Sequence, residues 1–162
     1  MKSAQLIIVI FLFLSACQPG DPSTPHMRER VAGLTVYEVN IRQHTAAGTL
    51  SAFTNDLPRL KELGVGVLWI MPVQPIGIKN RKEPLGSYYS IRNYNEINPE
   101  FGNEADFKTL VDKAHQLGMY VILDWVPNHT AWDNPWVTAH LDYYAQVEIG
   151  NIKHESAWLD TA

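Results

Sequence analysis

Apolar positions divide the chain into short continuous runs and longer stripes of helical period. Residues 34–40 are rich in β-branched and aromatic side chains, which predicts a strand. Residues 65–71 contain almost no polar side chain, which is typical of a strand covered on both faces. Between the two runs, residues 49–63 place apolar side chains three and four positions apart, and this spacing predicts a helix (Leu50, Phe53, Leu57, Leu60 and Leu63).

Two residues are expected to shape that first helix. Pro58 falls inside the helical pattern, so we expect either a kink or a restart capped by Asn55 or Asp56. Gly64 follows the last apolar position and is expected to end the helix, as glycine commonly does.

The same alternation continues toward the C-terminus. A second helix is predicted to begin near Asn103, a good N-cap with acidic residues in the turn that follows. Gly118 is expected to end this helix, and the apolar residues 119–123 predict a third strand, which closes at Asp124. The buried stripe of the helix is predicted from its spacing (Phe107, Leu110, Val111 and Ala114). The order β-α-β-α-β predicts an α/β fold with a parallel sheet.

The end of the third predicted strand carries candidate chemistry. Asp124 is followed by Asn128 and His129, so a carboxylate, an amide and an imidazole reach one edge of a parallel sheet, where α/β proteins bind ligands. Flat apolar rings gather in the same segment and suit the faces of sugar rings (Trp125, Trp132 and Trp136). The alternative is that Asp124 only caps the next turn and that His129 is a structural residue.

A loop of about thirty residues, 72–102, separates the second strand from the second helix. Loops of that length inside a compact domain are usually functional. In a parallel sheet this loop leaves the same edge as Asp124, so residues 86–94, with Tyr89 among them, are expected to wall a pocket there. The alternative for Tyr89 is simple packing within the loop.

Length and charge narrow the classes of partner. The 162 residues amount to about one domain, and the net charge of −4 gives no basic stripe, so nucleic acid is not an expected partner.

The N-terminus has the pattern of a secretion signal. Lys2 precedes nine apolar residues, 6–14, a run too short to span a bilayer as a stable helix. Leu-Ser-Ala-Cys at residues 14–17 resembles the bacterial lipobox, so Cys17 is expected to be lipidated. Residues 1–17 would then be the signal peptide and lipobox, 18–30 a tether, and 31–162 the folded part. This predicts a protein of the bacterial cell envelope, anchored to the membrane by lipid on the periplasmic or extracellular face. The alternative is an ordinary signal peptide with an incidental cysteine.

Several of these features together resemble the alpha-amylase superfamily, glycoside hydrolase family 13. The resemblance covers residues 34–136 and depends on Asn-Pro-x-Phe-Gly at 98–102, Ala-His-Gln-Leu-Gly at 114–118 and Asp-x-x-x-Asn-His at 124–129. It implies the N-terminal portion of a (β/α)8 TIM barrel of about three β/α units, an incomplete barrel within the α/β class.

The resemblance also implies roles for four residues. Tyr89 would stack on a sugar, His129 would hydrogen-bond the same sugar, and Asp124 would be an electrostatic member of the pocket. Asn128 matches an asparagine that binds structural Ca2+ in many members. Ser-Tyr-Tyr at residues 87–89 stands where many amylases have His-Gly-Tyr, so the family's exact contacts with the sugar are not carried over to these residues.

The function implied is that of a fragment of a retaining glycoside hydrolase acting on α-glucosidic bonds of starch-type glucans or maltooligosaccharides. The family's nucleophile and general acid/base come from the fourth and fifth strands and are expected downstream of Ala162, so no catalytic residue is assigned within the chain. The first alternative is a non-catalytic glucan-binding surface lipoprotein. A metal-dependent hydrolase using Asp124 and His129 is weaker, because no further ligand stands at a suitable spacing.

Overall fold

The structure, a computed structural model, describes residues 32–153. The described helices and strands belong to one compact unit that begins at Leu34. The predicted signal peptide and lipobox, Cys17 and the tether at 18–30 lie outside the described residues.

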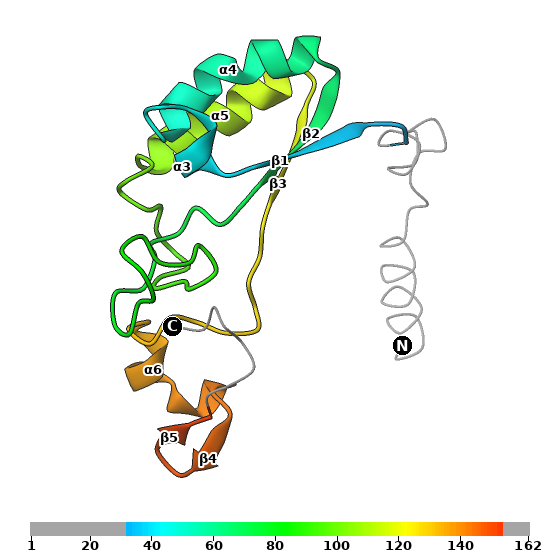
Figure 1. Ribbon diagram of the computed structural model, residues 1–162. Helices are drawn as coiled ribbons and strands as arrows, with labels where there is room; N and C mark the ends of the chain where they lie inside the picture. Colours follow the sequence, from blue (N-terminus) through cyan, green and yellow to red (C-terminus); the bar gives the residue numbers. More distant parts are fainter. Residues whose placement is uncertain (1–31, 154–162) are drawn as a thin grey trace, which may run out of the picture. The chain divides into compact units, whose positions relative to one another are not determined.

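The unit contains a three-stranded parallel sheet (Figure 1). Its strands are β1 (Thr35–Val39), β2 (Val65–Ile70) and β3 (Tyr120–Leu123), which lie side by side in sequence order. Both strand pairs are parallel, with Val39 opposite Ile70 and Ile70 opposite Leu123. The three predicted strands and their order are confirmed.

The first connecting helix, α4 (Leu50–Glu62), starts where a side chain can satisfy its free N–H groups. Thr49 is the N-cap, and its Oγ1 accepts a hydrogen bond of 3.2 Å from the backbone N–H of Ala52. Gly64 follows the helix with a φ of 87°, a left-handed conformation that glycine adopts without steric cost. The predicted glycine stop is therefore confirmed.

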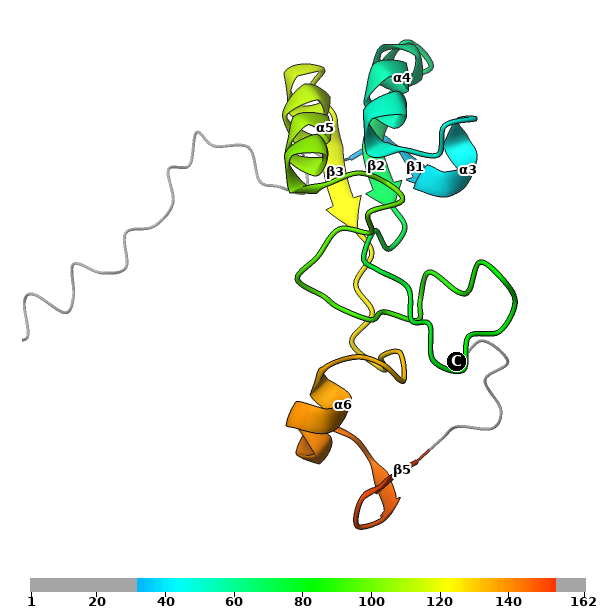
Figure 2. The same cartoon turned by 90° about the vertical axis from the view of Figure 1, so that its left-hand side faces the viewer.

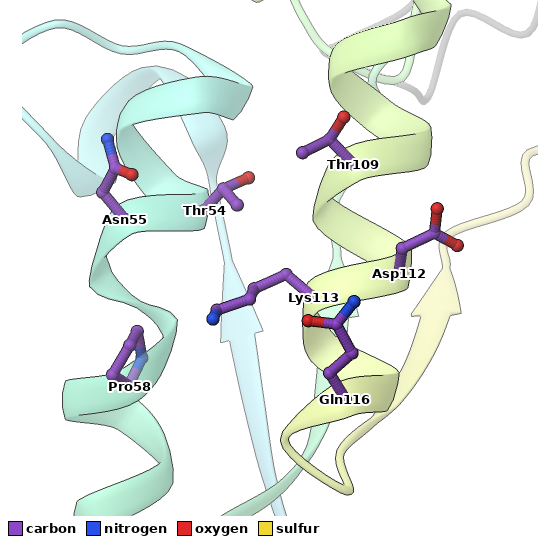
Figure 3. Close-up of a pocket in the computed structure, with 7 residues that line it drawn as sticks. All are labelled: Thr54, Asn55, Pro58, Thr109, Asp112, Lys113 and Gln116. Atoms are coloured by element: carbon purple, nitrogen blue, oxygen red, sulfur yellow. The ribbon is translucent and has the colours of Figure 1, made fainter.

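The predicted restart at Asn55 or Asp56 is wrong, because α4 runs through Pro58 as one helix. Pro58 lies on the exposed side, in a groove of about 520 Å³ between α4 and α5 (Figure 3). Proline removes one backbone hydrogen bond from a helix, and water can reach the affected carbonyl on an exposed side.

The second connecting helix, α5 (Glu104–Gln116), begins with a complete capping box. The side chain of Asn103 accepts hydrogen bonds from the N–H groups of Ala105 (2.8 Å) and Asp106 (3.2 Å). The carboxylate of Asp106 in turn accepts from the N–H of Asn103 at 2.9 Å. The predicted start of this helix is confirmed, and Gly118 follows it with a φ of 69°.

Both helices pack on the same face of the sheet, side by side (Figures 1 and 2). The core joins the apolar stripes of the helices to alternate residues of the strands, and its fully buried members include Phe53, Leu57, Leu68, Ile70 and Leu110. Strand residues that alternate with these point to the opposite face, where Val36, Trp69 and Ile122 are 53%, 39% and 49% exposed. The sheet therefore has one sealed face and one open face.

Short elements complete the described chain. A single helical turn, α3 (Ile41–His44), follows β1. Beyond β3 come α6 (Trp136–Ala139), the 3-10 turn η1 (Leu141–Tyr143) and an antiparallel hairpin of β4 (Gln146–Glu148) and β5 (Asn151–Ile152). Among the helices of residues 32–153, none combines the length and apolar character needed to cross a membrane.

The loop from Met71 to Asn103 is fixed to the sheet and to the segment after β3 by its backbone. The N–H of Asn98 donates to the carbonyl of Val73 at 2.7 Å, which closes the loop on itself. The N–H of Ala131 donates to the carbonyl of Ile91 at 2.9 Å. The loop is thus held against the chain that leaves β3, as expected for a wall at that edge.

An ion-pair cluster joins α3 to α4. Asp56 accepts two hydrogen bonds from Arg59, at 2.6 and 2.7 Å, and one of 2.7 Å from Nε2 of His44. The bonds from Arg59, and secondly from His44, hold the pKa of Asp56 well below its usual range. A carboxylate with a depressed pKa in the folded state stabilises the fold above the unfolded-state pKa and loses that contribution as pH falls.

We therefore expect Asp56→Asn to lower the free energy of unfolding at pH 7 by on the order of 1 kcal/mol. The difference from the parent chain should shrink as pH falls below about 4, the pKa of an unfolded aspartate. Denaturant unfolding followed by circular dichroism between pH 3 and pH 7 measures the loss of unfolding free energy and its dependence on pH. Asp112→Asn, which removes an exposed pair with Lys108, is the matched control and should change little. A difference that is the same at every pH contradicts the assignment.

Candidate functional site

The candidate site begins at the carboxyl end of β3. The N–H of Asp124 donates to the carbonyl of Ile70 at 2.9 Å, so the ladder between β2 and β3 reaches one residue past the strand. The carboxylate of Asp124 is half-buried and accepts a hydrogen bond of 3.1 Å from the hydroxyl of Tyr89. Two residues that are 35 positions apart, both singled out from the sequence, are therefore in direct contact.

Tyr89 is held in its neutral, hydrogen-donating form. Burial raises the pKa of Tyr89, and the negative charge of Asp124, its hydrogen bond to Asp124 and the charge of Glu38 act in the same direction. Because the hydroxyl hydrogen of Tyr89 is donated to Asp124, the pair presents acceptors: the remaining lone pairs of the carboxylate and the oxygen of Tyr89. Such a pair can accept hydrogen bonds from sugar hydroxyl groups.

Glu38 is a charged residue near the site that the sequence reasoning did not single out. It lies one position before the end of β1 and in register with Trp69 on β2, which in turn is opposite Ile122 on β3. These residues point to the open face of the sheet, below the edge that carries Asp124. The available signal was a lone carboxylate within an otherwise uncharged strand.

Asn128 and His129 form a second pair beyond Asp124. The side-chain amide nitrogen of Asn128 lies 3.3 Å from Nδ1 of His129, where the amide donates if Nδ1 is unprotonated. Asn128 is exposed and His129 is half-buried. The structure thus joins Tyr89 to Asp124 and Asn128 to His129, and the segment from 124 to 129 links the two pairs.

Tyr94 holds that segment in place. Its hydroxyl lies 2.6 Å from the carbonyl oxygen of Val126 and 2.8 Å from that of His129. The single hydroxyl hydrogen can be donated to either carbonyl, and burial raises the pKa of Tyr94, which keeps that hydrogen in place. The sequence placed residue 94 in the wall of the pocket but assigned no role to it.

Aromatic rings surround Tyr94, as the sequence suggested for this edge. The Trp136 ring stacks on the Tyr94 ring at 5.2 Å between centroids, and the Trp125 ring lies tilted at 5.3 Å. Tyr143 meets the Trp136 ring edge-on at 6.1 Å. Trp125 and Tyr143 are each 63% exposed, so large apolar ring surfaces face solvent here.

The predicted calcium ligand does not sit in a metal site within the described residues. The Asn128 amide is turned to His129, and no group of three or more His, Cys, Asp or Glu residues in the described part of the chain could hold a metal ion. Calcium takes six to eight oxygen ligands. Within residues 32–153 no Ca2+ site is therefore assigned, and no step of the chemistry is assigned to a metal. The groove between α4 and α5 is separate from the site, because its lining residues all belong to those helices.

Comparison with known proteins gives consistent matches. The family model described as "Alpha amylase, catalytic domain" matches residues 27–158. Alpha-amylase SusG of Bacteroides thetaiotaomicron is 39% identical over 93 residues, which cover 56% of this chain and 12% of that protein. The oligo-1,6-glucosidase of Parageobacillus thermoglucosidasius is 34% identical over 119 residues, which cover 68% of this chain and 20% of that protein.

Solved structures give the same result. The crystal structure of an alpha-amylase from Lactobacillus plantarum superposes with a TM-score of 0.77 at 42% identity, covering 81% of this chain and 31% of that one. The chain thus spans less than a third of the length of these relatives. The parallel strands and the helices that connect them are part of a (β/α)8 barrel, as the sequence predicted. Because the family model covers most of its length, the chain belongs to the alpha-amylase family and matches part of that family's catalytic domain.

Proposed function

We propose that this chain is part of a retaining glycoside hydrolase that acts on α-glucosidic bonds of starch-type glucans or maltooligosaccharides. The observation that carries the proposal is the hydrogen bond between Tyr89 and Asp124 at the carboxyl end of the sheet. In (β/α)8 barrels this end is where substrates bind. Relatives named as an alpha-amylase and an oligo-1,6-glucosidase support the same class of substrate.

The chemistry of the site suits a glucose ring. Asp124 accepts from a sugar hydroxyl, and the Tyr89 ring presents a flat face to the apolar side of the same sugar. His129 supplies a further hydrogen-bonding group at the edge that Tyr94 holds. The exposed rings of Trp125 and Tyr143 offer stacking surface for further units of a glucan.

Hydrolysis itself needs a different pair of groups. Retaining glycosidases use two carboxyl groups about 5–5.5 Å apart, one as nucleophile and one as general acid/base. The resemblance to the family implies that Asp124 serves binding and electrostatics and is not the nucleophile, and its carboxylate accepts a hydrogen bond from Tyr89. The nucleophile and the acid/base are proposed to follow Ala162 in the sequence of the full enzyme.

The N-terminus adds a proposal about location. Leu-Ser-Ala-Cys after a nine-residue apolar run supports lipidation of Cys17 and attachment to a membrane of the bacterial cell envelope. Structural Ca2+ remains a proposal for the whole enzyme that rests on family resemblance alone.

Binding of maltotriose by the chain, followed by titration calorimetry, tests the site. Tyr89→Phe removes the hydroxyl that Asp124 accepts from and keeps the ring, so binding should weaken by roughly two- to tenfold, the worth of one hydrogen bond. Tyr120→Phe removes a hydroxyl at the opposite end of β3 and should bind like the parent chain. Equal affinities for all three proteins would contradict the proposed site.

Reducing-end release from starch tests the assignment of Asp124. The purified 162-residue chain should release none, because binding groups without the carboxylate pair give no turnover. Turnover that disappears in Asp124→Ala would identify Asp124 as the nucleophile instead. Turnover by a longer chain that includes the later strands separates the enzyme from the alternative, a non-catalytic glucan-binding lipoprotein.

Mass spectrometry of protein extracted from bacterial membranes tests the anchor. We expect an N-terminal Cys17 that carries acyl chains, and Cys17→Ser should leave the protein in the soluble fraction. An unmodified Cys17 in a secreted product would show that the segment is an ordinary signal peptide.

A further inference from the structure

Arg42 lies over two aromatic rings next to the candidate site. The centre of its guanidinium group is 4.8 Å from the ring centroid of Tyr88 and 5.8 Å from that of Phe101. The two rings are stacked with their centroids 6.5 Å apart. Only 17% of the Arg42 side chain is exposed, so the group is held against the rings and away from most of the solvent.

This contact joins three segments that are distant in sequence. Arg42 belongs to α3, after β1, and Tyr88 belongs to the long loop. Phe101 precedes α5 and is 1% exposed, and its carbonyl accepts a hydrogen bond of 2.8 Å from the N–H of Leu50 at the start of α4. The loop is therefore fixed at Tyr88 to the rigid part of the sheet and helices.

The next residue after Tyr88 is Tyr89, whose hydroxyl contacts Asp124. The two neighbouring rings have different surroundings, because Tyr88 packs against the hydrophobic core and Tyr89 reaches the carboxyl end of β3. When the ring of Tyr88 is held in place, the adjacent backbone from which the Tyr89 side chain projects is held as well. We propose that Arg42 is a positioning residue that sets the placement of Tyr89 against Asp124. As a claim about glucan binding, the inference rests on the function proposed above.

The contact of Arg42 with the two rings positions Tyr88 more than the ion pair with Glu100 does. Arg42 also donates a hydrogen bond of 2.9 Å to the carboxylate of Glu100, but that carboxylate side chain is 61% exposed, and exposed pairs contribute little. A guanidinium is planar and stacks on aromatic faces, whereas a lysine ammonium is a compact charge that holds its hydration more strongly. Arg42→Lys is therefore a sharp test, because it keeps the positive charge and removes the planar group that lies over the two rings.

The experiment compares Arg42→Lys and Glu100→Gln in the full chain, with Arg59→Lys as a matched control on the surface of α4. One readout is the affinity for maltotriose by calorimetry. The other is the titration of Tyr89, followed by NMR of 13C-labelled tyrosine and assigned with Tyr89→Phe. Arg42→Lys should weaken binding roughly fivefold, within the range of a cation–π contact, and should move the pKa of Tyr89 down toward its ordinary value. Glu100→Gln and Arg59→Lys should change the affinity for maltotriose by less than about twofold and should leave the titration of Tyr89 unchanged.

Two variants of Tyr88 guard against a loss of folding in Arg42→Lys. Tyr88→Phe keeps the ring and should match the parent chain, while Tyr88→Leu fills the core without a ring and should behave like Arg42→Lys. An unchanged Tyr89 titration in Arg42→Lys or in Tyr88→Leu overturns the proposal, and so does an equal effect of Glu100→Gln. If the parent chain binds no maltotriose, the proposed function fails, and the titration of Tyr89 still decides the role of Arg42.

Discussion

The parallel pairing of β1, β2 and β3 is the constraint on which the other features depend. Because the strands run in the same direction, their carboxyl ends meet at one edge, and everything that leaves them begins there. Pairing in register places Val39, Ile70 and Leu123 side by side, so Asp124 enters the site directly beyond the last paired residue. A strand displaced by one residue would turn every side chain to the other face and carry the carboxylate away from Tyr89.

Local sequence determined most of the fold, because its signals act over a few residues. The capping box at Asn103 and the positive-φ glycine after α4 each depend on neighbours within one turn. Apolar spacing then selected the buried faces of both helices, except at Leu63, which follows α4 and is 67% exposed. The error at Pro58 has the same origin, since local rules count the lost hydrogen bond but do not see that the affected side of α4 is exposed.

The site was only partly predictable for the opposite reason. Asp124 and Tyr89 stood out because each lies in a recognisable segment that leads to the same edge. Glu38 and Arg42 did not, because their effects cross from one segment to another. The charge of Glu38 acts on Tyr89 from β1, and the guanidinium of Arg42 lies over rings from two other segments. No spacing along the chain encodes the orientation of such rings, which packing alone determines.

The two faces of the sheet divide stability from function. The face packed by α4 and α5 is sealed, and the Asp56 carboxylate on that side joins α4 to α3 through its bond with His44. The opposite face exposes Trp69 and Ile122 and carries Glu38 toward the edge that ends in Asp124. In a (β/α)8 barrel the inward face is filled by side chains from other strands. Parallel strands that cover these apolar residues in a complete barrel would have their own carboxyl ends at the same end of the barrel as Asp124. Burial of this face and completion of the site would therefore depend on the same strands.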